Sequence, residues 1–217
     1  MFGDPTYYIL RPNVYLGRNC FIGAFSIIGA LYGEMSDGQV STRIGGDANI
    51  RSHTVIYASS LIGKHFQTGH GVLIREHCHI GDNVSIGSHS VIEHHVTIED
   101  GVRIHSNVFI PEYTRLLEGC WIGPNVTFTN TLHPLCPKVK ECIGGPVIGS
   151  GAKIGAGAVI LPRRYIGENA LIGAGAVVVT NVPEGAVMVG NPARQIKTVD
   201  QLDCRYELID HPYEEEA

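Results

Sequence analysis

The segment His79–Ile104, HIGDNVSIGSHSVIEHHVTIEDGVRI, places isoleucine at every sixth residue, at positions 80, 86, 92, 98 and 104. The same spacing continues on both sides of this segment. Aliphatic or aromatic residues keep it from Ile44 to Phe128 with one exception, Thr68, and shorter series in the same rhythm run over residues 10–28 and 148–178. A period of six matches neither an α-helix nor an alternating strand. The chain is therefore an internal repeat with a six-residue unit.

A six-residue unit predicts a three-sided prism. Each unit would supply one short strand and one turn, so that three units complete a coil of 18 residues. The aliphatic residue and the small residue two places before it would point inward, and coils would stack about 4.8 Å apart. The glycine that often follows the aliphatic residue would relieve strain at the turn. We therefore expect an all-β protein, a parallel β-helix of about eight coils.

Composition narrows the function classes. The chain has 217 residues and a net charge of −5, which argues against a nucleic-acid partner or an anionic membrane surface. No apolar run approaches the roughly 18 residues that a membrane span needs, and the first residues lack the basic start of a signal peptide. A cytoplasmic protein with reduced cysteines is expected. Cys20, Cys78 and Cys120 fall on the inward small position and are predicted to be packed thiols.

None of the eleven histidines falls on an inward position. Residues 18 apart should stack on successive coils, and this register gathers polar residues into one column that ends at Thr129, Asn130 and Thr131. We predict that the column lines a cleft, although it could be only a solvated edge. The candidate acceptor contacts in it are Glu76, His77, Glu93, His94, His95, Glu112 and Tyr113.

One long loop interrupts the rhythm beside this column. The aliphatic residue after Phe128 is due near position 134 but arrives at Ile148, which leaves about 14 extra residues. Such an insertion usually has a functional reason. Three prolines and the pair Gly144-Gly145 indicate a shaped loop.

The motifs in and after the loop resemble a known family. TNTLHPLCP (129–137) and GGPVIGSGAKIGAGAVILP (144–162) are similar to sugar O-acetyltransferases of the galactoside, maltose and nodulation type. These belong to the hexapeptide-repeat acyltransferases, whose β-helix is left-handed, and the resemblance covers about residues 10–196. It implies an acyltransferase domain over 1–196 with the loop 129–147 inserted, followed by a short helix and an acidic tail over 197–217.

The resemblance also implies roles for individual residues. His133, in the His133-Pro134 pair, matches the general base of the family, and an imidazole suits that task near pH 7. Asn130 is a second catalytic candidate that could bind the acceptor or orient the loop. Acetyl-CoA would be the donor, held by Ala156, Ala174, Thr180 and Arg194. The family packs as homotrimers with active sites between subunits.

The sequence leaves the reaction partly open. VTFTN (126–130) resembles a motif of nucleotide-aminosugar N-acetyltransferases, so the acceptor could be a sugar hydroxyl or amine, with or without a nucleotide. One alternative is a zinc protein of the γ-class carbonic anhydrase type, because His65/His70 and His89/His94 are spaced by five. Their register does not match that family, and no metal site is predicted. A non-catalytic β-helix scaffold is the other alternative.

Overall fold

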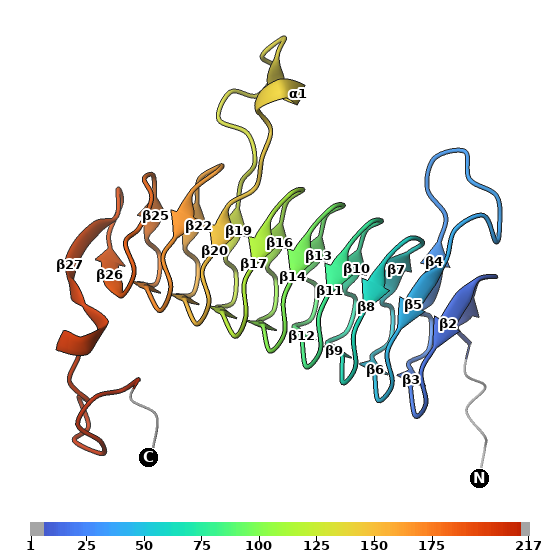
Figure 1. The fold of residues 1–217 in the computed structure, drawn as a ribbon, viewed down its shortest axis with the longest axis horizontal. Coiled ribbons are helices and arrows are strands. Elements are labelled where there is room, and N and C mark those ends of the chain that lie inside the picture. Colours follow the sequence, from blue (N-terminus) through green and yellow to red (C-terminus); the bar gives the residue numbers. More distant parts are fainter. Residues whose placement is uncertain (1–6, 214–217) are drawn as a thin grey trace.

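The computed structural model describes residues 7–213, which wind into a parallel β-helix with three flat sides (Figure 1). Strands that follow one another in the chain lie in different sheets, and strands 18 residues apart are neighbours in one sheet. Leu73 pairs with Val91, for example, and Val91 with Phe109. The predicted prism of about eight coils is confirmed.

Sheet A contains β1 (Ile9–Leu10), β4 (Ile27–Ala30), β7 (Val55–Tyr57), β10 (Leu73–Ile74), β13 (Val91–Ile92), β16 (Phe109–Ile110), β19 (Thr127–Phe128), β22 (Val159–Ile160) and β25 (Val177–Val178). Sheet B contains β2 (Val14–Leu16), β5 (Thr42–Ile44), β8 (Leu61–Ile62), β11 (His79–Ile80), β14 (Thr97–Ile98), β17 (Arg115–Leu116), β20 (Val147–Ile148) and β23 (Tyr165–Ile166). Sheet C contains β3 (Phe21–Ile22), β6 (Asn49–Ile50), β9 (Gln67–Thr68), β12 (Ser85–Ile86), β15 (Arg103–Ile104), β18 (Trp121–Ile122), β21 (Lys153–Ile154), β24 (Leu171–Ile172), β26 (Ala186–Val189) and β27 (Arg194–Thr198).

The core is one continuous column inside the prism. The inward aliphatic residues are almost completely buried from Ile28 to Val178, and each such side chain contributes about 1.5–3 kcal/mol. Cys78 and Cys120 are fully buried among them, and burial raises the pKa of each thiol to about 12. They are packed thiols, as predicted. Cys20 is only partly buried, and all six cysteines are free.

The turns explain two features of the six-residue unit. The third residue after the inward aliphatic has a left-handed backbone, with φ of 57° at both His77 and His95. Histidine, asparagine and glycine enter this region more readily than most residues. The glycine directly after the inward aliphatic residue is needed because a side chain there would collide with the backbone of the next coil. A Cβ atom on Gly155 would lie 2.5 Å from the backbone nitrogen of Ala174 on the next coil.

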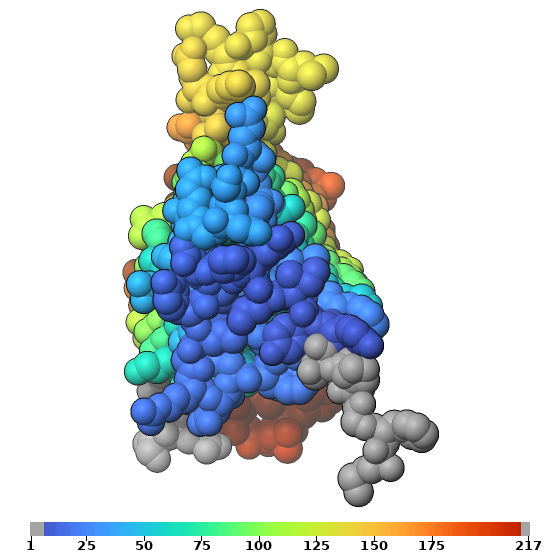
Figure 2. Space-filling model, turned by 90° about the vertical axis from the view of Figure 1, so that its right-hand side faces the viewer, coloured from blue at the N-terminus to red at the C-terminus, as the bar shows by residue number. Residues whose placement is uncertain are grey.

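We name the three edges of the prism by the sheets that they join. The A–B corner follows each strand of sheet A, the B–C corner each strand of sheet B, and the C–A corner each strand of sheet C. Two excursions leave the A–B corner: residues 31–41, between β4 and β5, and residues 129–146, between β19 and β20. Figure 1 shows both rising from the same side of the prism, and Figure 2 shows them along one edge. The long loop carries the short helix α1 (Val139–Cys142).

The C-terminal part closes sheet C. Strand β27 pairs antiparallel with β26 and includes residues on both sides of the expected boundary between 196 and 197. The division of the chain into residues 1–196 and 197–217 stays a prediction. The short C-terminal helix is the 3₁₀ helix η1 (Val199–Gln201). The acidic end of the predicted tail, residues 214–217, lies outside the described residues. Among residues 7–213, no helix has the length and apolarity that crossing a bilayer requires.

Candidate active site

The predicted polar column lies on the A–B corner, between the two excursions. We call it the polar corner and define it as residues 75–77, 93–95 and 111–113, which connect β10 to β11, β13 to β14 and β16 to β17. Residues 18 apart lie on neighbouring coils there, as their register predicts. Its next coil is the root of the long loop, at Thr129 and Asn130.

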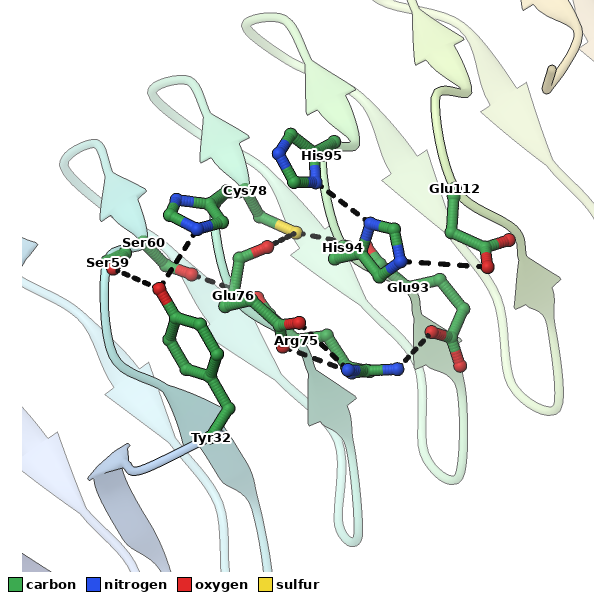
Figure 3. A network of polar contacts seen from close by, with 11 residues as sticks. Tyr32, Ser59, Ser60, Arg75, Glu76, Cys78, Glu93, His94, His95 and Glu112 are labelled. Atoms are coloured by element: carbon green, nitrogen blue, oxygen red, sulfur yellow. Dashed lines mark hydrogen bonds and ion pairs between the residues drawn. The ribbon is translucent and has the colours of Figure 1, made fainter. Parts of the chain in front are cut away.

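An ion-pair network forms the floor of the polar corner. Arg75 donates two hydrogen bonds to the carboxylate of Glu76, of 2.8 and 3.1 Å, and one of 3.0 Å to Glu93 on the next coil (Figure 3). Burial lowers the pKa of Arg75, but the bonds and charges of Glu76 and Glu93 outweigh it and raise the pKa overall. The side chain of Glu76 is only 9% exposed. Both oxygens of Glu76 accept hydrogen bonds from Arg75, which fixes the carboxylate within this floor.

Imidazole and phenol rings stack above this floor. The ring centres of His77 and His95 are 4.8 Å apart, and those of His95 and Tyr113 are 5.6 Å apart. The Nδ1 atoms of His94 and His95 are 2.8 Å apart, so one of them must donate a proton to the other. Burial lowers the pKa of His95, and His77 and His94 lower it further. The lowered pKa favours the neutral form of His95, and either Nδ1 atom of the pair can carry the shared proton.

A second chain of contacts joins His94 to the long loop. Nε2 of His94 lies 3.7 Å from Glu112 Oε1, and the other oxygen of Glu112 accepts a hydrogen bond from the side chain of Asn130. The side chains of His94 and Glu112 are 24% and 22% exposed, so solvent still reaches the pair. A histidine with one nitrogen held by a carboxylate or a second imidazole is oriented for proton transfer.

Tyr32, in the first excursion, also reaches the polar corner. Its hydroxyl lies 2.9 Å from His77 Nε2 and 3.0 Å from the hydroxyl of Ser59 (Figure 3). Sequence reasoning missed Tyr32 because the excursion has no six-residue register to place it. The available signal was that the rhythm breaks after Ile28 at the same corner as the long loop.

The long loop is anchored at its root and exposed at its tip. Thr129 and Gly144 donate backbone hydrogen bonds to Ile160 and Asn130, of 3.0 and 2.9 Å. Arg163, another residue that the sequence did not single out, donates to the carbonyls of Cys142 and Ile143. His133, in the first part of the loop, is exposed, and its carbonyl accepts a hydrogen bond from the backbone N–H of Cys136. Among the described residues, its imidazole has no side-chain partner.

The predicted donor contacts lie on two other parts of the prism. Ala156 and Ala174 are exposed on neighbouring coils of the C–A corner. Within residues 7–213, their backbone N–H groups have no acceptor. At some other turns, a side chain of the next coil accepts a hydrogen bond from the N–H at this position. Ser88 Oγ accepts the backbone N–H of His70 in this way, and Asp82 Oδ1 accepts that of Lys64. An alanine at position 174 has no oxygen to do the same for Ala156.

Thr180 and Arg194 do not join them at one place. Thr180 is exposed on the A–B corner after β25, and Arg194 is exposed at the start of β27. The guanidinium of Arg194 donates to the carbonyl of Ala193, at 3.0 Å. His133 and Ala156 lie on the two opposite edges of sheet A. A single chain therefore holds the predicted base and the predicted donor site apart.

The described residues contain no group of three or more His, Cys, Asp or Glu side chains arranged to hold a metal ion. The histidines of the polar corner are engaged by Tyr32, by Glu112 and by one another.

Comparisons with known proteins agree with the fold. The model of the bacterial transferase hexapeptide family, which has six repeats, matches residues 59–94, 77–112 and 145–180. The hexapeptide repeat of succinyl-transferase matches residues 13–33. The UDP-N-acetylglucosamine acyltransferase from Campylobacter jejuni has a similar structure, with a TM-score of 0.55 at 18% identity over 90% of this chain and 74% of that one. The corresponding Arabidopsis structure gives 0.56 at 19% identity, over 89% and 73%. The predicted left-handed β-helix is confirmed.

A curated relative matches a shorter segment more closely. Nodulation protein L of Rhizobium meliloti (strain 1021) is 49% identical over 81 residues, which is 36% of this chain and 44% of that protein. The matched segment thus spans less than half of the relative.

Proposed function

Since the chain belongs to the hexapeptide-repeat acyltransferases, we propose that it transfers an acetyl group from acetyl-CoA to a hydroxyl or amino group of a sugar or nucleotide-linked sugar. The observation that carries this proposal is the pair of unpaired backbone N–H groups at Ala156 and Ala174. A pantetheine arm carries amide carbonyls, which such groups can bind. The small side chains leave room for the arm to approach the turn.

The residues divide the chemistry between them. Acetyl-CoA would supply the acetyl group as a thioester. The N–H of Ala156 would donate a hydrogen bond to the thioester oxygen as negative charge develops on it. His133 would accept the proton of the attacking acceptor atom, and that proton would pass to the departing CoA sulfur. Arg194 and Thr180 would contact the CoA phosphates and the far end of the donor.

The geometry of the polar corner offers a second candidate for the base. Nδ1 of His94 is held by His95, and its Nε2 lies 3.7 Å from Glu112, too far for a hydrogen bond, so this nitrogen can still accept a proton. The imidazole of His133 has no side-chain partner among the described residues. An oriented imidazole transfers protons more efficiently than a mobile one. We keep His133 as the proposed base because a loop can reach across to another chain, and we name His94 as the alternative.

The outer face of sheet A supports assembly with further copies. Its outward residues are Ile9, Ile27, Val55, Leu73, Val91, Phe109, Thr127, Val159 and Val177, which leaves one polar side chain in nine. The corresponding positions of sheet B include Arg43, His79 and Arg115, and those of sheet C include Gln67, Arg103 and Lys153. A continuous apolar face of this length marks an interaction surface.

This face also offers a way to complete the site. The loop with His133 leaves one edge of sheet A, and Ala156 and Ala174 lie on the other edge. If copies pack through sheet A around a three-fold axis, the A–B corner of one can approach the C–A corner of the next. We therefore propose a homotrimer with its active sites between subunits. The cytoplasm is the proposed location, in keeping with six free cysteines.

The test is a calorimetric titration of acetyl-CoA into the protein and into Ala174→Ser. The serine hydroxyl would stand where Ser88 stands relative to His70 and would accept the N–H of Ala156. We expect the affinity for acetyl-CoA to fall about fivefold to tenfold, because one hydrogen bond is worth about 1 kcal/mol.

Ser150→Ala is the matched control, since it exchanges the same two residue types at the second position of a turn on the B–C corner. Its affinity for acetyl-CoA should equal that of the unchanged protein. Failure of a folded trimer to bind acetyl-CoA would reject the proposal and leave the scaffold alternative. Stoichiometric zinc in the purified protein would instead favour the carbonic anhydrase alternative.

A further inference from the structure

A trough on the prism, outside the polar corner, combines positive charge with hydrogen-bond donors. It has a volume of about 260 Å³ and lies along sheet C beside the C–A corner. Its floor includes Gln67, Ser85 and Ser88, and Arg51 and Arg103 stand at its two ends. Because β6 and β15 are three coils apart, the two arginines emerge about 14 Å from each other along the prism. No aspartate or glutamate lines the trough.

The two arginines are available for a ligand. Both are exposed, and none of the ion pairs formed within residues 7–213 involves either of them. Arg75 and Arg115, in contrast, are each paired with a carboxylate. Guanidinium groups bind phosphate and carboxylate in a bidentate manner. A trough with an unpaired arginine at each end is therefore suited to an anion.

The polar groups on the floor are also available. Ser88 Oγ accepts a hydrogen bond from the N–H of His70, which leaves its own O–H free to donate. The backbone N–H groups of Ser88 and Ser106 have no acceptor among the described residues. His105 lines the same trough, and its Nε2 atom is buried without a hydrogen-bond partner. Ser88 and Ser106 line the trough on two neighbouring coils, those of β12 and β15.

The position of the trough fits the proposed donor site. Ser106, Pro124 and Ala156 occupy the same place on successive coils, so Ala156 lies about 10 Å from the end of the trough at Ser106. A monosaccharide could bridge that gap, with its anionic substituent in the trough and its acceptor atom near Ala156. The far end of the trough points away from Ala174.

Resting on the proposed function, we propose that this trough binds the phosphoryl groups of the acceptor, as a sugar phosphate or a nucleoside-diphosphate sugar. The acceptor is thereby assigned as an anion, and a neutral sugar would lack this anchor. Arg51 and Arg103 are binding residues in this proposal and take no part in acetyl transfer itself.

The test is a titration of inorganic pyrophosphate into the protein, the single variants Arg51→Gln and Arg103→Gln, and the double variant. Arg18→Gln is the matched control, because Arg18 is equally exposed and unpaired but lies on the B–C corner. We expect each single variant to weaken pyrophosphate about threefold to tenfold, the double variant about tenfold or more, and the control not at all.

A parallel titration with acetyl-CoA separates the possible phosphate sources. Unchanged acetyl-CoA affinity in the double variant supports an acceptor site. An equal loss of affinity for acetyl-CoA would mean that the trough holds the donor's phosphates, which overturns the assignment. No pyrophosphate binding, or binding that Arg18→Gln weakens as much, would also overturn it.

The same data keep the two proposals apart. Acetyl-CoA binding without pyrophosphate binding would reject the phosphate site in the trough and leave the acetyltransferase proposal intact. Pyrophosphate binding without acetyl-CoA binding would leave an anion site on a protein that is not an acetyltransferase.

Discussion

The A–B and C–A corners border the same apolar sheet and are built from the same six-residue turn, but they present different chemistry. On the three coils of the polar corner, at the A–B corner, the second and third turn residues are large and mostly polar, as in Glu76-His77 and His94-His95, and they contact one another. On the two coils that follow the long loop, the C–A corner instead carries Ala156-Gly157 and Ala174-Gly175, which expose the backbone.

The difference shows how one scaffold can supply two kinds of site. The backbone of the turn is set by the inward residue and the left-handed third position, with φ of 57° at His95 and 67° at Gly157. The second and third residues then decide whether side chains or N–H groups face a ligand. We therefore place acceptor chemistry among side chains and donor binding on the backbone.

The largest expected effect tests whether a side chain supplies the acceptor chemistry. His133→Ala should lower kcat by about 100-fold to 10,000-fold, because it removes the proposed general base. Acetyl transfer to a series of sugar acceptors measures this loss. Lys140→Ala, an exposed change in the same loop, should leave kcat unaltered.

His94→Gln decides between the two candidate bases. If His133→Ala retains full activity while His94→Gln loses it, the base lies on the rigid coil and the loop has another role. A similar loss in both variants would mean that one of the two histidines positions the acceptor while the other takes its proton. The acceptor KM then distinguishes the two, since a positioning residue changes it and a base leaves it nearly constant.

A smaller effect is expected from the floor of the polar corner. Arg75→Ala leaves the carboxylate of Glu76 buried without its partner, so we expect stability to fall by about 1–3 kcal/mol. The loss should stay below the upper range for buried pairs because the side chain of Arg75 is 34% exposed. Urea unfolding of the protein and the variant measures it.

Arg115→Ala provides the matched control for this change. Its ion pair with Glu99 is long, at 3.9 Å, and both side chains are well exposed, so the expected loss is about 0–1 kcal/mol. Adding Glu76→Gln to Arg75→Ala should recover part of the lost stability, because it removes the unpaired charge. Equal losses in Arg75→Ala and Arg115→Ala would contradict a structural floor.

The six-residue rhythm predicts nearly everything that depends on register. It placed the inward core, the buried Cys78 and Cys120, and the alignment of residues 75–77, 93–95 and 111–113. Contacts formed by segments outside the rhythm could not be predicted in this way. Tyr32 and the anchored root of the long loop depend on tertiary contacts that no periodicity describes.

Register also says nothing about which polar groups pair with one another. Glu76 was expected to contact the acceptor, but both its oxygens accept hydrogen bonds from Arg75. The role of the predicted site residues stays a proposal. For the donor site, the sequence showed an alanine at both position 156 and position 174, on two successive coils after the long loop.

The smallest expected effect concerns the protonation of the polar corner. Burial lowers the pKa of His95, with further lowering by His77 and His94 and a smaller opposing effect of Glu76, while Tyr113 stacks on the ring. In the unfolded chain this imidazole titrates near its ordinary value of about 6.5. Between the two pKa values the unfolded state binds more protons, so stability is lost as the pH falls below about 6.5.

His95→Asn removes this contribution and keeps a residue that tolerates the left-handed backbone. The Tm of the unchanged protein should therefore fall more steeply from pH 7 to pH 5 than that of the variant, as followed by circular dichroism. The difference between the two curves reports the protonation of His95 together with its contacts to His77 and His94. Parallel curves would mean that protonating His95 carries no cost in the folded protein, which would contradict its lowered pKa.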